Sequence, residues 1–319
     1  MKRFYNIFLF VIVIVLSLLG IEGLLRVKNQ DQKNYVIEMW RYAKLLKIYD
    51  DNTGMGHEHI PNQRMMLENV EIRLNSYGLR GPEMDFTDHS RKRILFLGSS
   101  NTFGWGVEER KIMTSLIQDQ LRNKALIVNA GVCNYNSARY VHQFKERLRS
   151  VHPDIVVVHG NIRDAEELRG NDNNFILRHS QLMAMSSYVW QLMLFEIFNK
   201  EGLADHYIKL YSEGSKGFQS MVAALKELDD LSKEDGFKVI YFIIPEPHFF
   251  KNDPFSEIHD KIRRTVETLG WTYIDPTEKL RSFKSQDLWV MPSDAHYNAL
   301  GQRVMADILL PYLRGMLEN

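Results

Sequence analysis

Three residue types that together support nucleophilic catalysis occur in two short segments of this chain. Residues 98–104 have the sequence GSSNTFG and follow the apolar run 93–97, which predicts Ser100 on a tight turn between a strand and a helix. Near the C-terminus, one residue separates Asp294 from His296. A serine hydroxyl becomes an effective nucleophile when an imidazole accepts its proton and a carboxylate orients that imidazole. The pattern therefore predicts a Ser-His-Asp site.

Each segment also has a purely structural interpretation. A Gly/Ser turn after an apolar strand is commonly no more than a turn. An Asp-x-His sequence ahead of a helix can serve only as its cap. Short motifs match by chance, so the chemical interpretation depends on the order and the surroundings of the segments.

Two further segments are expected at the same edge of a sheet. Residues 126–132 (LIVNAGV) predict a strand that ends in a small-residue loop, and 154–158 (DIVVV) predict a buried strand. Three successive strands thus end in loops that carry Ser100, Asn134 and Asn161. Sites in open parallel sheets form at the carboxyl ends of the strands, so we expect these residues to lie together.

The loops also offer hydrogen-bond donors for an oxyanion. The side-chain amide of Asn161 is one candidate, joined by the backbone N–H groups of Ser100 and Asn134. The alternative for Asn161 is a turn residue that bonds to its own backbone. The remaining residues expected to line the pocket are Ser99, Asn101, His159, Arg163 and His248, the last with a structural role as the alternative.

In this order, the segments resemble the blocks of the SGNH hydrolases, also called GDSL esterases and lipases, over residues 91–319. The first family block is Gly-Asp-Ser-x-Thr-x-Gly, and here Ser99 replaces the usual aspartate. The resemblance implies that Ser100 is the nucleophile, His296 the base and Asp294 its partner. It also implies a three-layer α/β/α sandwich with a mainly parallel, flavodoxin-like sheet.

The second and third family blocks supply the oxyanion groups. The second block presents the backbone N–H of a glycine; Asn134 occupies that place, with Gly131 nearby. Asparagine tolerates a left-handed backbone better than most residues, so this N–H can still be presented. The third-block asparagine matches Asn161. A one-residue gap like that between Asp294 and His296 occurs in family branches that act on acylated polysaccharides.

The resemblance implies an O-ester hydrolase, such as a deacetylase, or an O-acyl transferase. The expected substrate is an acylated glycan or another small ester, without a cofactor or a metal ion. Membrane-bound acyltransferases or polysaccharide-assembly proteins are the expected partners. The sequence leaves open whether water or a sugar hydroxyl accepts the acyl group. The rival hypothesis, motivated by Ser99 and Asn134, is a weakly active or inactive glycan-binding or assembly protein with the same fold.

Composition excludes some classes of protein. The 319 residues include 40 Lys and Arg and 40 Asp and Glu, so the formal net charge is zero. This balance argues against a nucleic-acid-binding protein. The single cysteine, Cys133, excludes an intramolecular disulfide and a multi-cysteine metal site, and we expect it to be buried. The pair His57 and His59 has no ligand-spaced partners, so we expect surface histidines rather than a metal site.

The N-terminus predicts a membrane anchor. Lys2 and Arg3 precede an apolar run over 4–21, about 18 residues and close to the length that a spanning helix needs. A cleaved signal peptide and a buried core helix are the alternatives. No small-x-small cleavage site follows, and basic residues do not normally precede a core helix. We therefore expect a single-pass protein with a cytoplasmic N-terminus and a periplasmic or extracellular C-terminal domain.

The chain is expected to have three parts. These are a cytoplasmic tip and anchor over 1–26, a leader over 27–90, and the catalytic domain over 91–319. Helical spacing of apolar residues in the leader predicts an amphipathic helix over 34–48, and residues 64–74 predict a hairpin. Within the catalytic domain, residues 165–215 are expected to form a lid or insertion. Its Met- and aromatic-rich stretch has burial in the core as the alternative.

Overall fold

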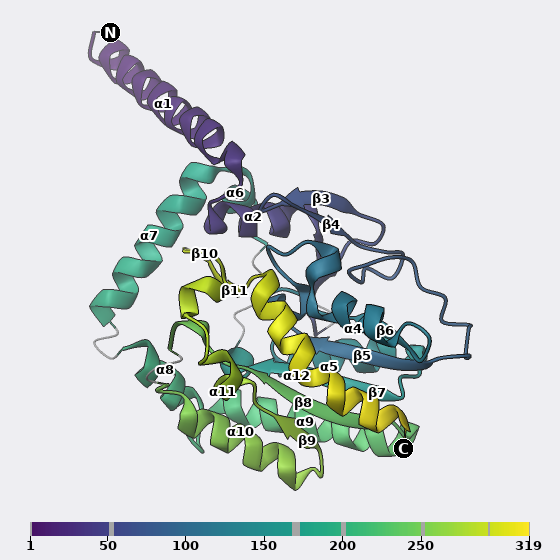
Figure 1. Cartoon of the computed structure of the whole chain (residues 1–319). Coiled ribbons are helices and arrows are strands. Elements are labelled where there is room, and N and C mark those ends of the chain that lie inside the picture. Colours follow the sequence, from purple (N-terminus) through teal and green to yellow (C-terminus); the bar gives the residue numbers. More distant parts are fainter. Residues whose placement is uncertain are drawn as a thin grey trace. The chain divides into compact units, whose positions relative to one another are not determined.

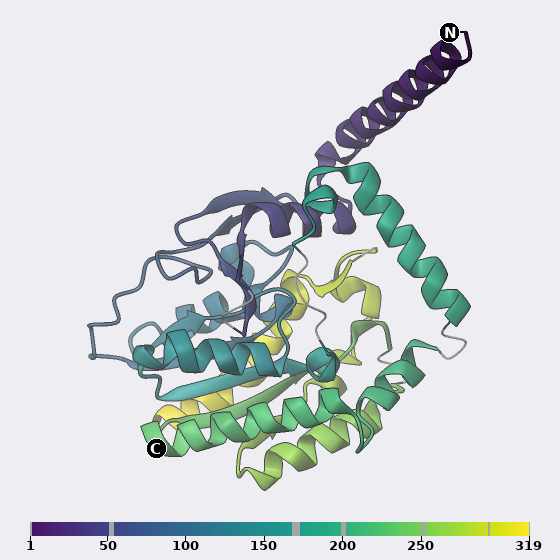
Figure 2. The ribbon, with the colours of Figure 1, turned by 180° about the vertical axis from the view of Figure 1, so that it is seen from behind.

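The protein divides into two compact units. The structure, a computed structural model, describes residues 2–50, 54–167, 173–198, 202–249, 253–292 and 294–318 (Figures 1 and 2). The smaller unit comprises Met1–Leu46, Leu67–Asn69 and Asp172–Lys200, and the larger unit comprises the rest. This division crosses the boundaries expected from the sequence, because part of the region expected as a lid belongs to the unit that contains the N-terminal helices.

A five-stranded, fully parallel sheet forms the centre of the larger unit. Its strands, in spatial order, are β6 (Ala125–Asn129), β5 (Lys92–Gly98), β7 (Ile155–Asn161), β8 (Lys238–Ile244) and β9 (Thr272–Ile274). The central strands are continuous apolar runs because helices cover both of their faces. Strands β5, β6 and β7 match those predicted over 93–97, 126–132 and 154–158, and the structure confirms the parallel sheet.

Alternate residues of each strand pack into two separate cores. Leu95 and Leu97 of β5 face a core with α5 (Ser137–Gln143), α9 (Lys216–Asp235) and α10 (Ser256–Thr268). Ile94 and Phe96 face the other core, with α4 (Met113–Leu121) and α12 (Ala299–Glu318). This two-residue alternation places helices on both faces of the sheet. The predicted three-layer α/β/α sandwich is therefore confirmed.

A hairpin near the C-terminus follows the last strand of the sheet. It pairs β10 (Trp289–Met291) with β11 (Asp294–Tyr297) and was not predicted. The Tyr297 hydroxyl donates to the carbonyl of Pro245 at 2.9 Å, and the Tyr297 N–H donates to Asn101 Oδ1 at 3.1 Å. These bonds fix β11 against the end of β8 and against α3 (Ser100–Phe103).

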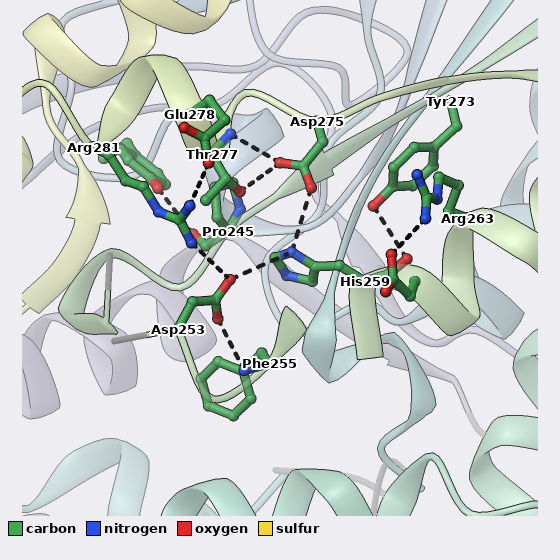
Figure 3. Close-up of polar contacts among 12 residues, drawn as sticks. Pro245, Asp253, Phe255, His259, Arg263, Tyr273, Asp275, Thr277, Glu278 and Arg281 are labelled. Atoms are coloured by element: carbon green, nitrogen blue, oxygen red, sulfur yellow. Dashed lines mark hydrogen bonds and ion pairs between the residues drawn. The ribbon is translucent and has the colours of Figure 1, made fainter. Parts of the chain in front are cut away.

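A charged cluster joins the segments that follow β8 and β9 (Figure 3). His259 of α10 lies between Asp253, at 3.9 Å, and Asp275, at 3.5 Å, and Arg281 lies 3.9 Å from Asp253. Burial alone would raise the pKa of the Asp275 carboxyl, but hydrogen bonds from His259 and Thr277 outweigh it and hold the pKa below its usual range. The cluster ties α10 to the strand-end side of the sheet.

The leader contains two small antiparallel sheets. They are β1 (Lys47–Asp50) with β2 (Gly56–His59), and β3 (Arg64–Leu67) with β4 (Val70–Arg73). The second is the predicted hairpin, and its turn residues Glu68 and Asn69 have φ values of 49° and 61°. The predicted amphipathic helix is α2 (Tyr35–Leu45); it ends before residue 48 because Lys47 already pairs in β1.

The histidine pair of the leader is buried, so the prediction of surface histidines was wrong. His57 donates from Nε2 to the carbonyl of Cys133, and His59 donates from Nδ1 to the carbonyl of Gly78, both at 2.9 Å. The two side chains point the same way because they are two positions apart in a strand. Burial lowers the pKa of His57 to about 2 and that of His59 to about 3, which keeps both rings neutral. Cys133 is buried, as predicted.

The smaller unit is helical. Of the residues that the structure describes, those of α1 (Lys2–Lys28), with the short turn after it, form the helix that is long and apolar enough to cross a membrane. The unit also contains α2, α6 (Phe175–His179) and α7 (Gln181–Phe198), whereas α8 (Leu203–Leu210) belongs to the larger unit. Residues 168–172 and 199–201 of the region expected as a lid lie outside the described residues. The Met- and aromatic-rich stretch forms most of α7.

Candidate active site

Ser100 occupies the predicted turn between a strand and a helix. It is the first residue of α3, which follows β5 directly. A Cβ atom added at Gly98 would lie 2.1 Å from Thr102 Oγ1 and 2.8 Å from the carbonyl of His159, so this sharp turn requires glycine. Gly104, with a φ of 78°, ends the helix. The turn leaves Ser100 half-buried at the carboxyl end of the sheet.

His296 and Asp294 lie beside Ser100. His296 Nε2 is 2.7 Å from Ser100 Oγ, and His296 Nδ1 makes a short hydrogen bond with Asp294 Oδ1. Residues two apart in a strand share a face, so the one-residue spacing in β11 brings the carboxylate against the ring. The backbone N–H of His296 also donates to Asp294 Oδ1, at 3.0 Å. One chain of hydrogen bonds thus joins the three residues.

A tryptophan that the sequence did not single out completes this chain. Trp105 donates from Nε1 to Asp294 Oδ2 at 2.9 Å, and both side chains are buried. Both oxygens of the carboxylate therefore accept hydrogen bonds, which fixes its orientation. Trp105 directly follows the first motif, but its partner is 189 positions away, and no local pattern links them.

The candidate oxyanion groups lie on the neighbouring strand-end loops. Asn134 has a φ of 66°, the left-handed conformation that a glycine would adopt easily. Asn161 ends β7 and caps the short helix η6 (Ile162–Ala165): its Oδ1 accepts from the N–H of Arg163 at 2.8 Å. Its Nδ2 donates to Ser99 Oγ at 3.1 Å. The amide is therefore both a turn residue and a donor aimed at the nucleophile turn.

The buried carboxyl of Asp164 holds the backbone of Asn161. Asp164 Oδ2 accepts from the Asn161 N–H at 3.2 Å and from the Tyr140 hydroxyl at 2.8 Å. Burial raises the pKa of Asp164 to about 7. Space here is tight: a Cβ atom added at Gly160 would lie 2.1 Å from the Tyr241 hydroxyl. The cluster therefore fixes the backbone at the end of β7, from which the Asn161 side chain projects.

His159, expected to line the pocket, is instead fully buried in β7. Its Nδ1 is joined to Thr102 Oγ1 by a hydrogen bond of 3.0 Å, and its ring stacks on Phe242 with centroids 5.4 Å apart. Burial lowers the pKa of His159 to about 3, so the ring is neutral. His159 and Asn161 share a face of β7, but His159 lies within the sheet, under α-helical cover, whereas Asn161 is the last residue of the strand. His159 therefore supports the turn from inside the core.

The other expected pocket residues lie on strand-end segments. Asn101 uses its side-chain oxygen to hold β11, and Arg163 is exposed on η6. His248, on the short helix η7 (Pro247–Phe249), pairs with Glu246 at 2.6 Å, and its ring lies 4.7 Å from that of Trp289. Within the described ranges, no group of three or more His, Cys, Asp or Glu residues has an arrangement that could hold a metal ion.

Several solved structures are similar to this chain at low sequence identity. TesA has a TM-score of 0.49 and 14% identity, over 70% of this chain and 99% of TesA. The lipase/acylhydrolase from Enterococcus faecalis has a TM-score of 0.45 and 14% identity, over 70% and 96%. The acetyl xylan esterase AlAXEase has a TM-score of 0.43 and 17% identity, over 69% and 99%.

Family comparison covers most of the sandwich. No curated protein sequence matches the chain. The family described as GDSL-like Lipase/Acylhydrolase matches residues 96–304, which span the segment from β5 to α12 and include Ser100, Asp294 and His296. The match extends over more than half of the sequence. The chain therefore belongs to the GDSL-like lipase/acylhydrolase family.

Proposed function

We propose that this protein is a serine O-ester hydrolase or O-acyl transferase. The hydrogen-bond chain from Ser100 Oγ through His296 to Asp294 carries the proposal. In this chain Asp294 holds the ring so that Nε2 faces the hydroxyl, and the ring can take its proton.

The reaction proceeds through an acyl-enzyme. Ser100 Oγ attacks the acyl carbonyl while His296 Nε2 takes the hydroxyl proton. The oxyanion of the tetrahedral intermediate accepts hydrogen bonds from the N–H groups of Ser100 and Asn134 and from Asn161 Nδ2. Collapse of the intermediate breaks the ester C–O bond, and His296 returns the proton to the leaving alcohol. Water or a sugar hydroxyl then attacks the acyl-enzyme while His296 takes its proton. Collapse of this second intermediate breaks the bond between Ser100 Oγ and the acyl group, and His296 returns the proton to Ser100 Oγ.

An acylated glycan is the proposed substrate, with an acetyl ester as the simplest case. The strand-end loops around Ser100 carry polar side chains: Asn101, Asn134, Asn161 and Arg163. Such a rim favours an alcohol portion rich in hydroxyl groups over a long acyl chain. The one-residue gap between Asp294 and His296, which resembles that of the branches acting on acylated polysaccharides, supports the same choice.

The proposed location is outside the cytoplasm, with α1 as an uncleaved single-pass anchor. The helix is apolar and exposed along its length, and Lys2 and Arg3 precede its apolar run. Basic residues mark the cytoplasmic end of such helices. An anchored enzyme at this place could exchange acyl groups with a membrane-bound acyltransferase or a polysaccharide-assembly complex.

Product analysis on the full-length protein in detergent tests the activity. We expect release of acetate from an acetylated glycan and from an aryl acetate, and labelling of Ser100 by a serine-directed phosphonate. Ser100→Ala should abolish turnover, and His296→Ala should abolish both turnover and labelling. Added sugar acceptors distinguish transfer from hydrolysis through the appearance of an acylated sugar. A glycan-binding protein would instead show no turnover, no label and a polymer affinity unaffected by Ser100→Ala.

A further inference from the structure

Helix α7 is apolar on almost every side and yet exposed. Residues 181–195 carry no charged side chain. Met183 is 45% exposed, Trp190 61% and Met193 51%, whereas Ala184 is buried. A helix that is apolar all round normally lies in a protein core or in a membrane. The exposed surface of α7 therefore requires an apolar covering.

The first turn of α7 is fixed to the C-terminal end of α1. The Glu22 carboxylate accepts from the N–H groups of Gln181, at 3.1 Å, and Leu182, at 2.8 Å. Arg26 donates from Nη2 to the carbonyl of His179 at 2.6 Å. These contacts tie the start of α7 to the last turns of α1, where its apolar run ends. From this point α7 runs crosswise to α1 (Figures 1 and 2).

Basic side chains surround a cavity at the same end of α1. The cavity measures about 190 Å³, and its lining includes Arg26, Arg41, Lys44 and Arg178, with Trp40 as an aromatic wall. Arginine and lysine bind phosphate groups through charge-assisted hydrogen bonds. The charge of this lining therefore complements the phosphates of lipid headgroups, at the depth where an anchored α1 leaves the hydrocarbon.

We propose that α7 is a second membrane-contacting element, lying in the boundary between lipid headgroups and acyl chains, with the basic cavity facing lipid phosphates. The inference rests on the proposed anchoring of α1. Because an anchored α1 brings the bilayer to α7 in every molecule, the bilayer is a better occupant than a second copy, whose contact depends on concentration. Tyr188 and Trp190 suit this boundary, where one part of the ring is apolar and the other wet.

Quenching of tryptophan fluorescence by brominated lipids tests the proposal on the full chain. The protein is reconstituted in phosphatidylcholine and phosphatidylglycerol vesicles with or without bromine on the acyl chains. We expect more than half of the lipid-dependent quenching to disappear in Trp190→Phe. Trp271→Phe is the matched control: it removes a buried tryptophan of the larger unit and should leave the quenching unchanged.

Further variants separate the proposal from its alternatives. Phe8→Trp, placed on α1 in the Trp190→Phe background, should be quenched by brominated lipid if α1 is inserted. Quenching of this probe without a contribution from Trp190 would overturn the α7 proposal while leaving the anchor intact. Absence of both signals would overturn both. Met193→Cys molecules that cross-link to one another in vesicles at high dilution would assign the surface to a second copy and overturn the bilayer proposal.

Discussion

The indole of Trp105 and the carboxylate of Asp294 are joined by a buried hydrogen bond of 2.9 Å, which leaves Oδ1 of Asp294 directed at His296. The donor lies in the segment that directly follows α3, and the acceptor lies in β11. This contact therefore sets the angle at which Asp294 meets the ring, and hence the direction of Nε2 toward Ser100.

Loss of the Trp105 hydrogen bond should lower turnover without unfolding the protein. A hydrogen bond to a charged group contributes about 1.5–3 kcal/mol. If most of that loss appears in the barrier, Trp105→Phe should reduce kcat by roughly 10- to 100-fold, with a small change in KM. Kinetics with an aryl acetate measure kcat and KM, and a thermal melt shows whether the variant stays folded.

Trp271 offers a matched control for this substitution. It is also buried, and its Nε1 donates to Asp229 Oδ1 at the same distance of 2.9 Å, but away from the triad. Trp271→Phe should lower the melting temperature and leave kcat of the folded enzyme near that of the wild type. Equal losses of kcat in the two variants would assign the effect of Trp105 to general packing.

The triad should behave as one unit. Ser100→Ala and His296→Ala should each remove most of the activity, and the double variant should be little worse than either one. Asp294→Asn should retain more activity than either, because it disturbs the orientation of His296 without removing the base. Rate constants for the single and double variants test this. Multiplicative losses in the double variant would show that Ser100 and His296 act independently.

Removal of the Asn161 amide should slow turnover more than it weakens binding. Loss of one oxyanion donor lowers kcat by about 10²–10³-fold. Asn136→Ala is the matched control, because Asn136 also caps a helix at a strand-end loop, accepting from the Arg139 N–H at 3.1 Å. It should affect stability and leave kcat almost unchanged. If both asparagine variants lost kcat equally, the oxyanion role of Asn161 would have to be withdrawn.

The buried Asp164 should make stability fall as pH rises. Its pKa is about 7 in the folded protein against an ordinary value of 3.8, so the folded state binds more protons between these values. The stabilisation is complete below about pH 4 and is lost as pH rises to about 7. Asp164→Asn removes this dependence. The urea midpoint should fall less between pH 4.5 and pH 7.5 in the variant than in the wild type. An equal fall in both proteins would exclude Asp164 as the source.

Local patterns predicted much of the fold because the central strands are apolar throughout. The triad could be proposed because its residue types and their order along the chain are distinctive. Other features depend on distant partners. His57 and His59 can be buried because the carbonyls of Cys133 and Gly78 accept hydrogen bonds from their rings, and nothing near them in sequence indicates these partners.

Similar reasons explain what was missed at the site itself. The strand that carries Asp294 and His296 is short and is defined by its pairing with β10, so the sequence predicted the two residues but not the strand. The intrinsic preferences of four residues cannot specify such a strand, because its pairing with β10 and its tertiary contacts determine its conformation. Trp105 was missed for the same reason, because its role exists only through Asp294.

Membrane topology is open to a direct test. If Lys2 and Arg3 lie on the cytoplasmic side and α1 spans the bilayer, as proposed, the C-terminal domain should lie outside. Alkaline phosphatase fused at the C-terminus should therefore be active, and the full-length protein should stay with membranes after a carbonate wash. Replacing both Lys2 and Arg3 by glutamine should lower the correctly oriented fraction, because these charges set the orientation. A cytoplasmic reporter active at the C-terminus, or a mature N-terminus near Val27, would contradict the anchor.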